Sequence, residues 1–345
     1  MPPHPLPFLP RPMDLIANFV SKASAMIRQL EISHFKSIRR LALTCKRVNV
    51  FVGAPNTGKT NILEALALLS SSAPTHLKSI CRFETMDHLF FNFDLTEPIS
   101  VETDLLKAKL SFDAAREEFR LELRDSGEGS WVYPFDFKGT RHPVVSAPYE
   151  SSVLFYEFRD SVEFGENAVS HLAPPHGTNL PFLLKTQPKL RELVSEIFRD
   201  HGLRLNIKPF DHQIEFVKAF GEAFVSFPLR VISTTLRRLM FLLLAIESNA
   251  GKTLLLDEPE AKTFPFFTRY LAERMAFSPS NQFFLTTHNP YLLQCLLEKT
   301  PVQDLAIHVV SADEQGETRC RVIAEDQFQE LFELDLFYNL EDFQL

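Results

Sequence analysis

The chain has 345 residues, 45% of them hydrophobic, and a formal net charge of -8. This length and composition allow one large domain or two ordinary ones with a substantial core, and the negative charge argues against a protein whose whole surface binds nucleic acid. None of the four cysteines lies in a C-x-x-C pair or beside a histidine at ligand spacing, so we expect no zinc site and a reducing, cytoplasmic location. The longest apolar run, residues 236–246, contains two arginines and is too short to span a membrane.

The chain opens with a proline-rich stretch. Residues 1–12 hold six prolines, and residues 1–25 lack the basic start and the apolar core of a secretory signal. We expect residues 1–25 to be a disordered, dispensable extension and Met26 to be a candidate native start. The fold-bearing pattern then begins with three β-rich runs, at residues 27–32, 41–45 and 48–52.

A phosphate-binding loop follows the third run. It fits the pattern G-x-x-x-x-G-K-[ST] without a mismatch and lies between a strand and a helix expected to reach about residue 69; its sequence is Gly53-Ala54-Pro55-Asn56-Thr57-Gly58-Lys59-Thr60. Backbone N–H groups of such a loop point at an anion, and the helix dipole favours negative charge there. We predict that the phosphates of a bound nucleotide contact the whole loop and Asn61, that Lys59 reaches the β- and γ-phosphates, and that Thr60 ligates Mg²⁺.

The middle of the chain has a different pattern. Apolar and polar residues alternate between turns, which predicts an antiparallel meander over residues 99–105, 109–112, 119–123 and 131–137. A further strand is expected at residues 153–158, and helices at about residues 189–200 and 212–221. Residues 80–95 fit no element, and residues 98–225 show no sustained heptads.

From residue 226 the chain alternates helix and strand. Apolar spacing predicts helices at residues 236–246, 266–275 and 290–298. The continuous apolar run at residues 253–256 is typical of a strand buried on both faces, and further strands are expected at residues 282–287, 305–310 and 319–324. This order indicates an α/β fold with parallel strands.

Two carboxylates follow the apolar strand directly. Asp257 and Glu258 are therefore expected at the carboxyl edge of the sheet, where α/β folds bind ligands. Asp257 can hold Mg²⁺ directly or through water, and Glu258 can orient or deprotonate an attacking water. A surface acidic turn is the alternative, which the upstream phosphate loop disfavours.

Two further positions complete the predicted site. His288 follows the next strand, and at that edge we interpret it as a γ-phosphate sensor, although a lone histidine is more often structural. Ser233 begins a helix, where its hydroxyl can cap the helix or form part of an anion site, and both can hold. Because the chain has its own phosphate loop, an anion site at Ser233 suggests a γ-phosphate that is bound in trans, from another subunit.

The order of these motifs resembles that of the ABC-type ATPases of the SMC/RecF/OLD class. Four segments carry the resemblance: LEISHFKSI (residues 30–38) as an opening strand, DEPEA (257–261) as Walker B and the following loop, THN (287–289) as the H-loop, and STTLRR (233–238) as a degenerate signature motif. The resemblance covers roughly residues 27–345. Within the class, stand-alone bacterial AAA family ATPases with one head domain are the most similar.

The resemblance implies a fold and an activity. The fold is an ABC/SMC-head-like P-loop NTPase sheet, with helices on both faces and an inserted antiparallel β plus helical subdomain. The implied division is an extension (1–25), two lobes of the head (26–95 and 226–345) and the insertion between them (96–225). The implied activity is Mg²⁺-dependent ATP hydrolysis by a homodimer that forms on ATP, with DNA or an effector protein as partner and DNA maintenance or phage defence as output.

Several positions depart from the family pattern. No glutamine occurs between residues 61 and 186, so the Q-loop residue has no clear match; Glu84, His88 and Asn92 are candidates. Lys262 stands where the family often has histidine, and the signature lacks its double glycine. Too few residues follow His288 for a toprim domain, so we expect no nuclease activity. A non-catalytic ATP-sensing module is the main alternative function; a transporter subunit or a P-loop kinase fits the motifs poorly.

Overall fold

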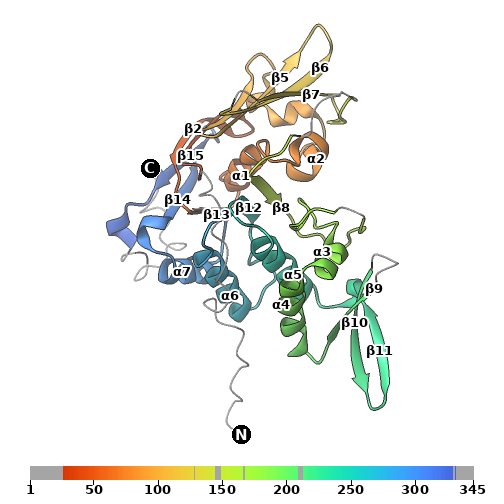
Figure 1. Cartoon of the computed structure of the whole chain (residues 1–345). Helices are drawn as coiled ribbons and strands as arrows, with labels where there is room; N and C mark the ends of the chain where they lie inside the picture. The colour runs from red at the N-terminus through yellow and green to blue at the C-terminus, as the bar shows by residue number, and fades with distance from the viewer. Residues whose placement is uncertain are drawn as a thin grey trace.

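The computed structural model describes residues 26–331 apart from 128, 144–148, 166–167, 209–212 and 329–330 (Figure 1). One six-stranded sheet has the order β15-β14-β3-β13-β12-β8, and its strands are parallel except β15. Its strands are β3 (Val48–Val52), β8 (Val153–Tyr156), β12 (Thr253–Asp257), β13 (Gln282–Thr286), β14 (Leu305–Ala312) and β15 (Thr318–Val322). The expected parallel α/β sheet is confirmed, and its inner strands are buried on both faces, as their apolar runs predict.

A second six-stranded sheet is antiparallel, with the order β2-β1-β4-β5-β6-β7. It contains β1 (Gln29–Phe35), β2 (Ile38–Thr44), β4 (Ile99–Thr103), β5 (Leu106–Asp113), β6 (Glu118–Asp125) and β7 (Ser130–Phe135). The predicted meander therefore continues the sheet that the amino-terminal strands begin, because β4 pairs with β1. Strand pairings thus cross both the border at residue 95 and, through β8 and β12, the border at residue 225, so the division into lobes stays a prediction.

Helices cover both faces of the parallel sheet. Helix α1 (Lys59–Ala67) and helix α2 (Ala73–Ile80) lie between the two sheets, and α1 shares a hydrophobic core with both of them. The other face packs against α5 (Thr234–Glu247), α6 (Pro265–Ala276), α7 (Pro290–Lys299) and the shorter pair α3 (Leu180–Thr186) and α4 (Pro188–Arg199). Residues 80–95, which fit no predicted element, contain two 3₁₀ turns, η2 (Met86–Leu89) and η3 (Phe91–Phe93).

The helix expected at residues 212–221 is wrong. This segment is β10 (Gln213–Phe220), the central strand of a three-stranded sheet with β9 (Arg204–Lys208) and β11 (Ala223–Pro228). Its isoleucine, valine and phenylalanine residues favour a strand, and Gly221, with φ 61°, makes the turn into β11. The sheet projects from the base of α5 and α4 in Figure 1.

The other expected helices and strands occur within a few residues of their predicted ends. Residue 212 and the extension at residues 1–25 lie outside the described residues. A search of the described helices for one with the length and apolar character of a membrane span finds none.

Candidate functional site

The phosphate loop has the close packing that its glycines require. Gly58 has φ 95°, and a Cβ there would lie 2.0 Å from the Thr318 hydroxyl. A Cβ on Gly53 would lie 2.1 Å from the Val310 carbonyl oxygen. Strands β14 and β15 thus pack closely against the loop, and only glycine fits at these two positions.

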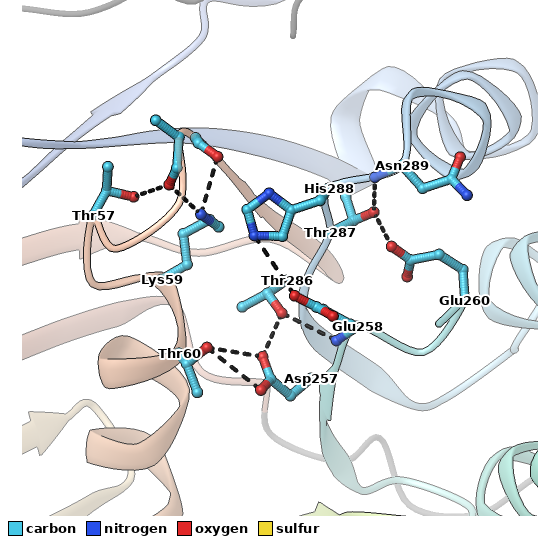
Figure 2. A network of polar contacts seen from close by, with 12 residues as sticks. Thr57, Lys59, Thr60, Asp257, Glu258, Glu260, Thr286, Thr287, His288 and Asn289 are labelled. Carbon is cyan, nitrogen blue, oxygen red and sulfur yellow. Dashed lines mark hydrogen bonds and ion pairs between the residues drawn. The ribbon is translucent and has the colours of Figure 1, made fainter. Parts of the chain in front are cut away.

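Lys59 is folded back onto its own loop. Its Nζ donates to the carbonyls of Gly53 and Ala54, at 3.0 and 2.7 Å, and the Ala54 carbonyl also accepts from the Thr57 hydroxyl (Figure 2). Burial lowers the pKa of Lys59 to about 8, and the negative charges of Glu258 and Asp257 oppose that shift. The structure therefore holds a cation in the loop, on hydrogen bonds that an anion can replace.

Thr60 and Asp257 lie together at the carboxyl edge of the parallel sheet. The Thr60 hydroxyl is 3.2 and 3.4 Å from the two Asp257 carboxylate oxygens. Thr286, at the end of β13, donates its hydroxyl to Asp257 Oδ1 at 2.5 Å and accepts from the Glu258 backbone N–H at 3.1 Å. One carboxylate beside one hydroxyl suits Mg²⁺, which keeps several waters and takes phosphate oxygens as its other ligands.

No larger metal cluster accompanies this pair: within the described residues, no group of three or more His, Cys, Asp or Glu side chains could hold a metal ion. A metal at this edge would thus rely on Thr60 and Asp257 from the protein and on the nucleotide for the rest.

Glu258 and His288 face each other at the same edge. His288 Nε2 lies 3.6 Å from Glu258 Oε1, and Glu258 has a left-handed backbone with φ 44°. Burial and the nearby Lys59 cation lower the pKa of His288, while Glu258 and Asp257 oppose that shift. The imidazole is therefore kept neutral, as a hydrogen-bonding group rather than a second cation.

A buried acid joins the loop after β12 to the segment that carries His288. Glu260 Oε1 accepts from the Thr287 hydroxyl at 2.5 Å, and that hydroxyl accepts from the Asn289 backbone N–H. Burial raises the pKa of Glu260 to about 7, and its hydrogen bonds oppose the shift. Asn289 in turn caps α7, so the position of His288 is fixed from both sides.

Ser233 lies apart from this group. It precedes α5, and its side chain makes no capping hydrogen bond, so the capping interpretation fails for this residue. Thr234 and Thr235 are engaged elsewhere, with Asp160 at 3.5 Å and the Lys262 carbonyl at 3.0 Å. Among the described residues, no hydrogen bond joins Ser233 to the phosphate loop, and its predicted contact with a nucleotide in trans stays a prediction.

Sequence reasoning missed the polar residues behind the loop. Thr318 donates to the Thr57 carbonyl at 3.1 Å and lies 2.7 Å from the Ser37 hydroxyl, which also accepts from the Asn61 side chain at 2.7 Å. The Asn61 side chain therefore faces Ser37, and the backbone of Asn61 remains the group for a phosphate. Ser37 and Thr318 are 281 residues apart, and no pattern in the sequence predicts that they are in contact.

A cavity of ≈360 Å³ opens beside the Thr60–Asp257 pair. Its lining includes Glu157, since β8 pairs with β12 in a register that puts Tyr156 opposite Leu256. The three residues suggested earlier for the Q-loop, Glu84, His88 and Asn92, are not among its lining residues. The sequence predicted a strand at residues 153–158, which contains Glu157. Only the pairing of that strand with β12, which the sequence does not specify, places Glu157 beside Asp257.

Several solved structures are similar to this chain. An SMC head bound to the C-winged helix domain of ScpA matches with a TM-score of 0.52 and 16% identity, covering 89% of this chain and 100% of that one. An SMC head from Thermotoga maritima (TM-score 0.43, 14% identity, 87% and 100% covered) and one from Pyrococcus furiosus bound to the C-terminal domain of ScpA (0.49, 15%, 89% and 98%) also match.

The family described as a protein of unknown function (DUF2813) matches residues 25–103, and no curated protein matches the chain. The similarity to the SMC head with a TM-score of 0.52 shows that the chain has a P-loop NTPase fold of the SMC-head type. The predicted resemblance is confirmed for that fold, and the narrower placement in the RecF and OLD branches stays a prediction.

Proposed function

We propose that this protein is a Mg²⁺-dependent ATPase that works as a molecular switch. One observation carries the proposal: Thr60 contacts the Asp257 carboxylate at 3.2 Å, next to a Glu258–His288 pair and opposite Lys59. Phosphoryl transfer needs a cradle for the phosphates, a metal site and a group that orients water, and the edge of the parallel sheet offers all three.

Each residue has a role in this proposal. The backbone of residues 53–61 binds the phosphates, and Lys59 exchanges its contacts with the loop carbonyls for contacts with the β- and γ-phosphates. Thr60 and Asp257 would hold Mg²⁺, which neutralises charge on the phosphates when it is bound. Glu258 orients and deprotonates the attacking water, and His288 donates a hydrogen bond to the γ-phosphate.

Glu157 takes the place of the missing Q-loop glutamine. It lines the cavity that also contains Thr60 and Asp257, and it follows the strand next to β12. A carboxylate at this point can accept a hydrogen bond from a metal-bound water. This assignment replaces the three candidates offered by sequence alone.

The assembly in this proposal is an ATP-dependent homodimer. Ser233 has a hydroxyl that is not used for capping, at the positive end of α5, which suits the γ-phosphate of a partner subunit. DNA or an effector protein receives the signal, in DNA maintenance or phage defence. The partner remains an analogy: one matched SMC head is bound to a winged-helix domain, which is a property of that protein. Four free cysteines support a cytoplasmic location.

Two variants and size-exclusion chromatography test the proposal. Lys59→Ala should abolish ATP binding, whereas Glu258→Gln should bind ATP, hydrolyse it at least about a hundredfold more slowly and accumulate as a dimer. Glu298→Gln, at an exposed position on α7, is the matched control and should behave as wild type. A Glu258→Gln protein that stays monomeric at saturating ATP rejects the dimer. A wild-type protein that binds ATP without releasing ADP favours the ATP-sensing alternative.

A further inference from the structure

The loop that follows β12 contains two residues with a left-handed backbone. Glu258 has φ 44° and Lys262 has φ 58°. Residues with a Cβ rarely adopt this conformation, and they keep it only where the surrounding structure holds them. The conformation of the loop therefore depends on contacts that other elements make.

Side chains of α5 hold both left-handed residues by their carbonyl oxygens. Arg238 donates from Nη2 to the Glu258 carbonyl at 2.6 Å, and Thr235 donates from Oγ1 to the Lys262 carbonyl at 3.0 Å. Within the loop, the Ala261 N–H also donates to the Glu258 carbonyl, at 3.0 Å. Helix α5 is thus hydrogen-bonded to the loop at both residues with a left-handed backbone.

The Arg238 guanidinium serves this contact above all. In the part of the chain that the structure describes, the Glu258 carbonyl is its one recorded hydrogen-bond acceptor, and its Nε atom is buried without a partner. Burial lowers the pKa of Arg238, and the charges of Glu260, Glu258 and Asp257 oppose that shift. The guanidinium is half-buried, lies 5.9 Å from the centroid of the Phe158 ring and lines the cavity beside Thr60 and Asp257. Its hydrogen bond nevertheless goes to the Glu258 carbonyl, which indicates that holding this carbonyl is its role.

We propose that Arg238 is a positioning residue that fixes the Glu258 carboxylate for water activation. The proposal rests on the ATPase function above, in which Glu258 activates the attacking water. Because the guanidinium holds the Glu258 carbonyl and Thr235 holds the other end of the loop, α5 sets the backbone conformation from which the Glu258 carboxylate projects.

Steady-state kinetics of three variants test the assignment. Arg238→Met keeps the length of the side chain but removes its donors, and we expect kcat to fall about tenfold or more while the Kd for a fluorescent ATP analogue stays within about twofold, because no group of the phosphate cradle changes. Arg238→Lys keeps a donor and should recover a large part of kcat. Arg269→Met, on the exposed face of α6, is the matched control and should leave both constants unchanged.

A combination with Glu258→Gln separates positioning from a general structural effect. Since Arg238 acts through Glu258, the double variant Arg238→Met/Glu258→Gln should hydrolyse ATP as slowly as Glu258→Gln alone, and no more slowly. If Arg238→Met lowers kcat in the Glu258→Gln background by the same factor as in the wild type, the proposal is overturned. A wild-type kcat in Arg238→Met also overturns it. If Arg238→Met does not fold, Arg238→Leu, which also lacks a donor, takes its place with the same expected losses.

Wild-type turnover is measured first, so that the two proposals fail in different ways. Absence of ATP hydrolysis by the wild-type protein overturns both. Normal hydrolysis by the wild type together with normal hydrolysis by the Arg238 variants overturns the positioning role alone and leaves the ATPase in place.

Discussion

Thr318 lies directly against Gly58 of the phosphate loop, although the two residues are near opposite ends of the chain. A Cβ on Gly58 would be 2.0 Å from the Thr318 hydroxyl, which donates to the loop carbonyl of Thr57 at 3.1 Å. The hairpin strand β15 therefore packs against the phosphate loop and restricts its shape. A loop whose shape is already restricted loses less entropy when it binds a ligand.

Removal of the Thr318 hydroxyl should destabilise the phosphate loop and weaken ATP binding without abolishing it. Thr318→Val keeps the volume but loses the contacts with Thr57 and Ser37, so we expect unfolding free energy to fall by about 1–2 kcal/mol and the Kd for ATP to rise about three- to tenfold. Thr300→Val is the matched control, since the Thr300 hydroxyl is buried without a partner and its removal should be neutral or stabilising. Denaturant melts and nucleotide titration measure both effects, and equal behaviour of the two variants contradicts the role of Thr318.

The local parts of this site were predictable from the sequence, and the contacts between distant segments were not. Gly53 to Thr60 and Asp257-Glu258 each follow an apolar run, so strand ends and the phosphate loop could be placed from pattern alone. The contact of Ser37 with Thr318 depends on how two sheets meet, which no local pattern specifies. Residues 213–220 were misread because their apolar residues do not alternate strictly: Phe216 and Val217 are adjacent, as are Ala219 and Phe220. That spacing, followed directly by a glycine, also fits an amphipathic helix.

Glu157 shows a second reason why the site could not be predicted in full from the sequence. Its strand was expected, but its place beside Asp257 follows only from the pairing of β8 with β12. Parallel neighbours are joined by long crossover connections, so their order in the sheet is a tertiary property. The left-handed backbone of Glu258 is likewise imposed by its neighbours, because glutamate has no preference for it.

ATP affinity should depend on the charge of Lys59. Its pKa of about 8 in the free protein means that the loop loses its cation as pH rises through that value. Bound phosphates favour the protonated amine, so binding above pH 8 takes up a proton, and the Kd should rise by up to about tenfold per pH unit there. Calorimetric titrations between pH 7 and 9.5 in buffers of different ionisation enthalpy measure the proton uptake. Lys59→Arg keeps its charge throughout, and a Kd that rises equally in this variant contradicts the assignment.

Glu260 should make the protein less stable above neutral pH. Its folded pKa of about 7 exceeds the ordinary value of 4.5, so the unfolded state ionises first and stability is lost as pH rises from about 4.5 to about 7. The full cost is up to about 3 kcal/mol. Glu260→Gln keeps an acceptor for Thr287 and should therefore melt at higher temperature than wild type at pH 8 but not at pH 5. Equal gains at both pH values would show that ionisation of Glu260 is not the cause.

His308 should have the opposite signature, on the acid side. It lies fully buried in β14, stacked on Phe51 at 4.8 Å between ring centroids, and neither ring nitrogen has a hydrogen-bond partner within the described structure. Burial lowers its pKa from 6.5 to about 3. The unfolded state therefore takes up a proton first, and stability is lost as pH falls from about 6.5 toward about 3, by about 2 kcal/mol at pH 5.

His308→Leu removes this titration and keeps an apolar side chain against Phe51. We expect its gain in unfolding free energy to be about 2 kcal/mol larger at pH 5 than at pH 7.5, where the wild-type imidazole is neutral in both states. Its two unpartnered nitrogens still cost free energy at pH 7.5, so some gain remains there. His201→Leu, at an exposed position after α4, is the control and should show no pH-dependent gain. A His308→Leu gain that is independent of pH assigns the cost to unpaired nitrogens alone and contradicts the titration argument.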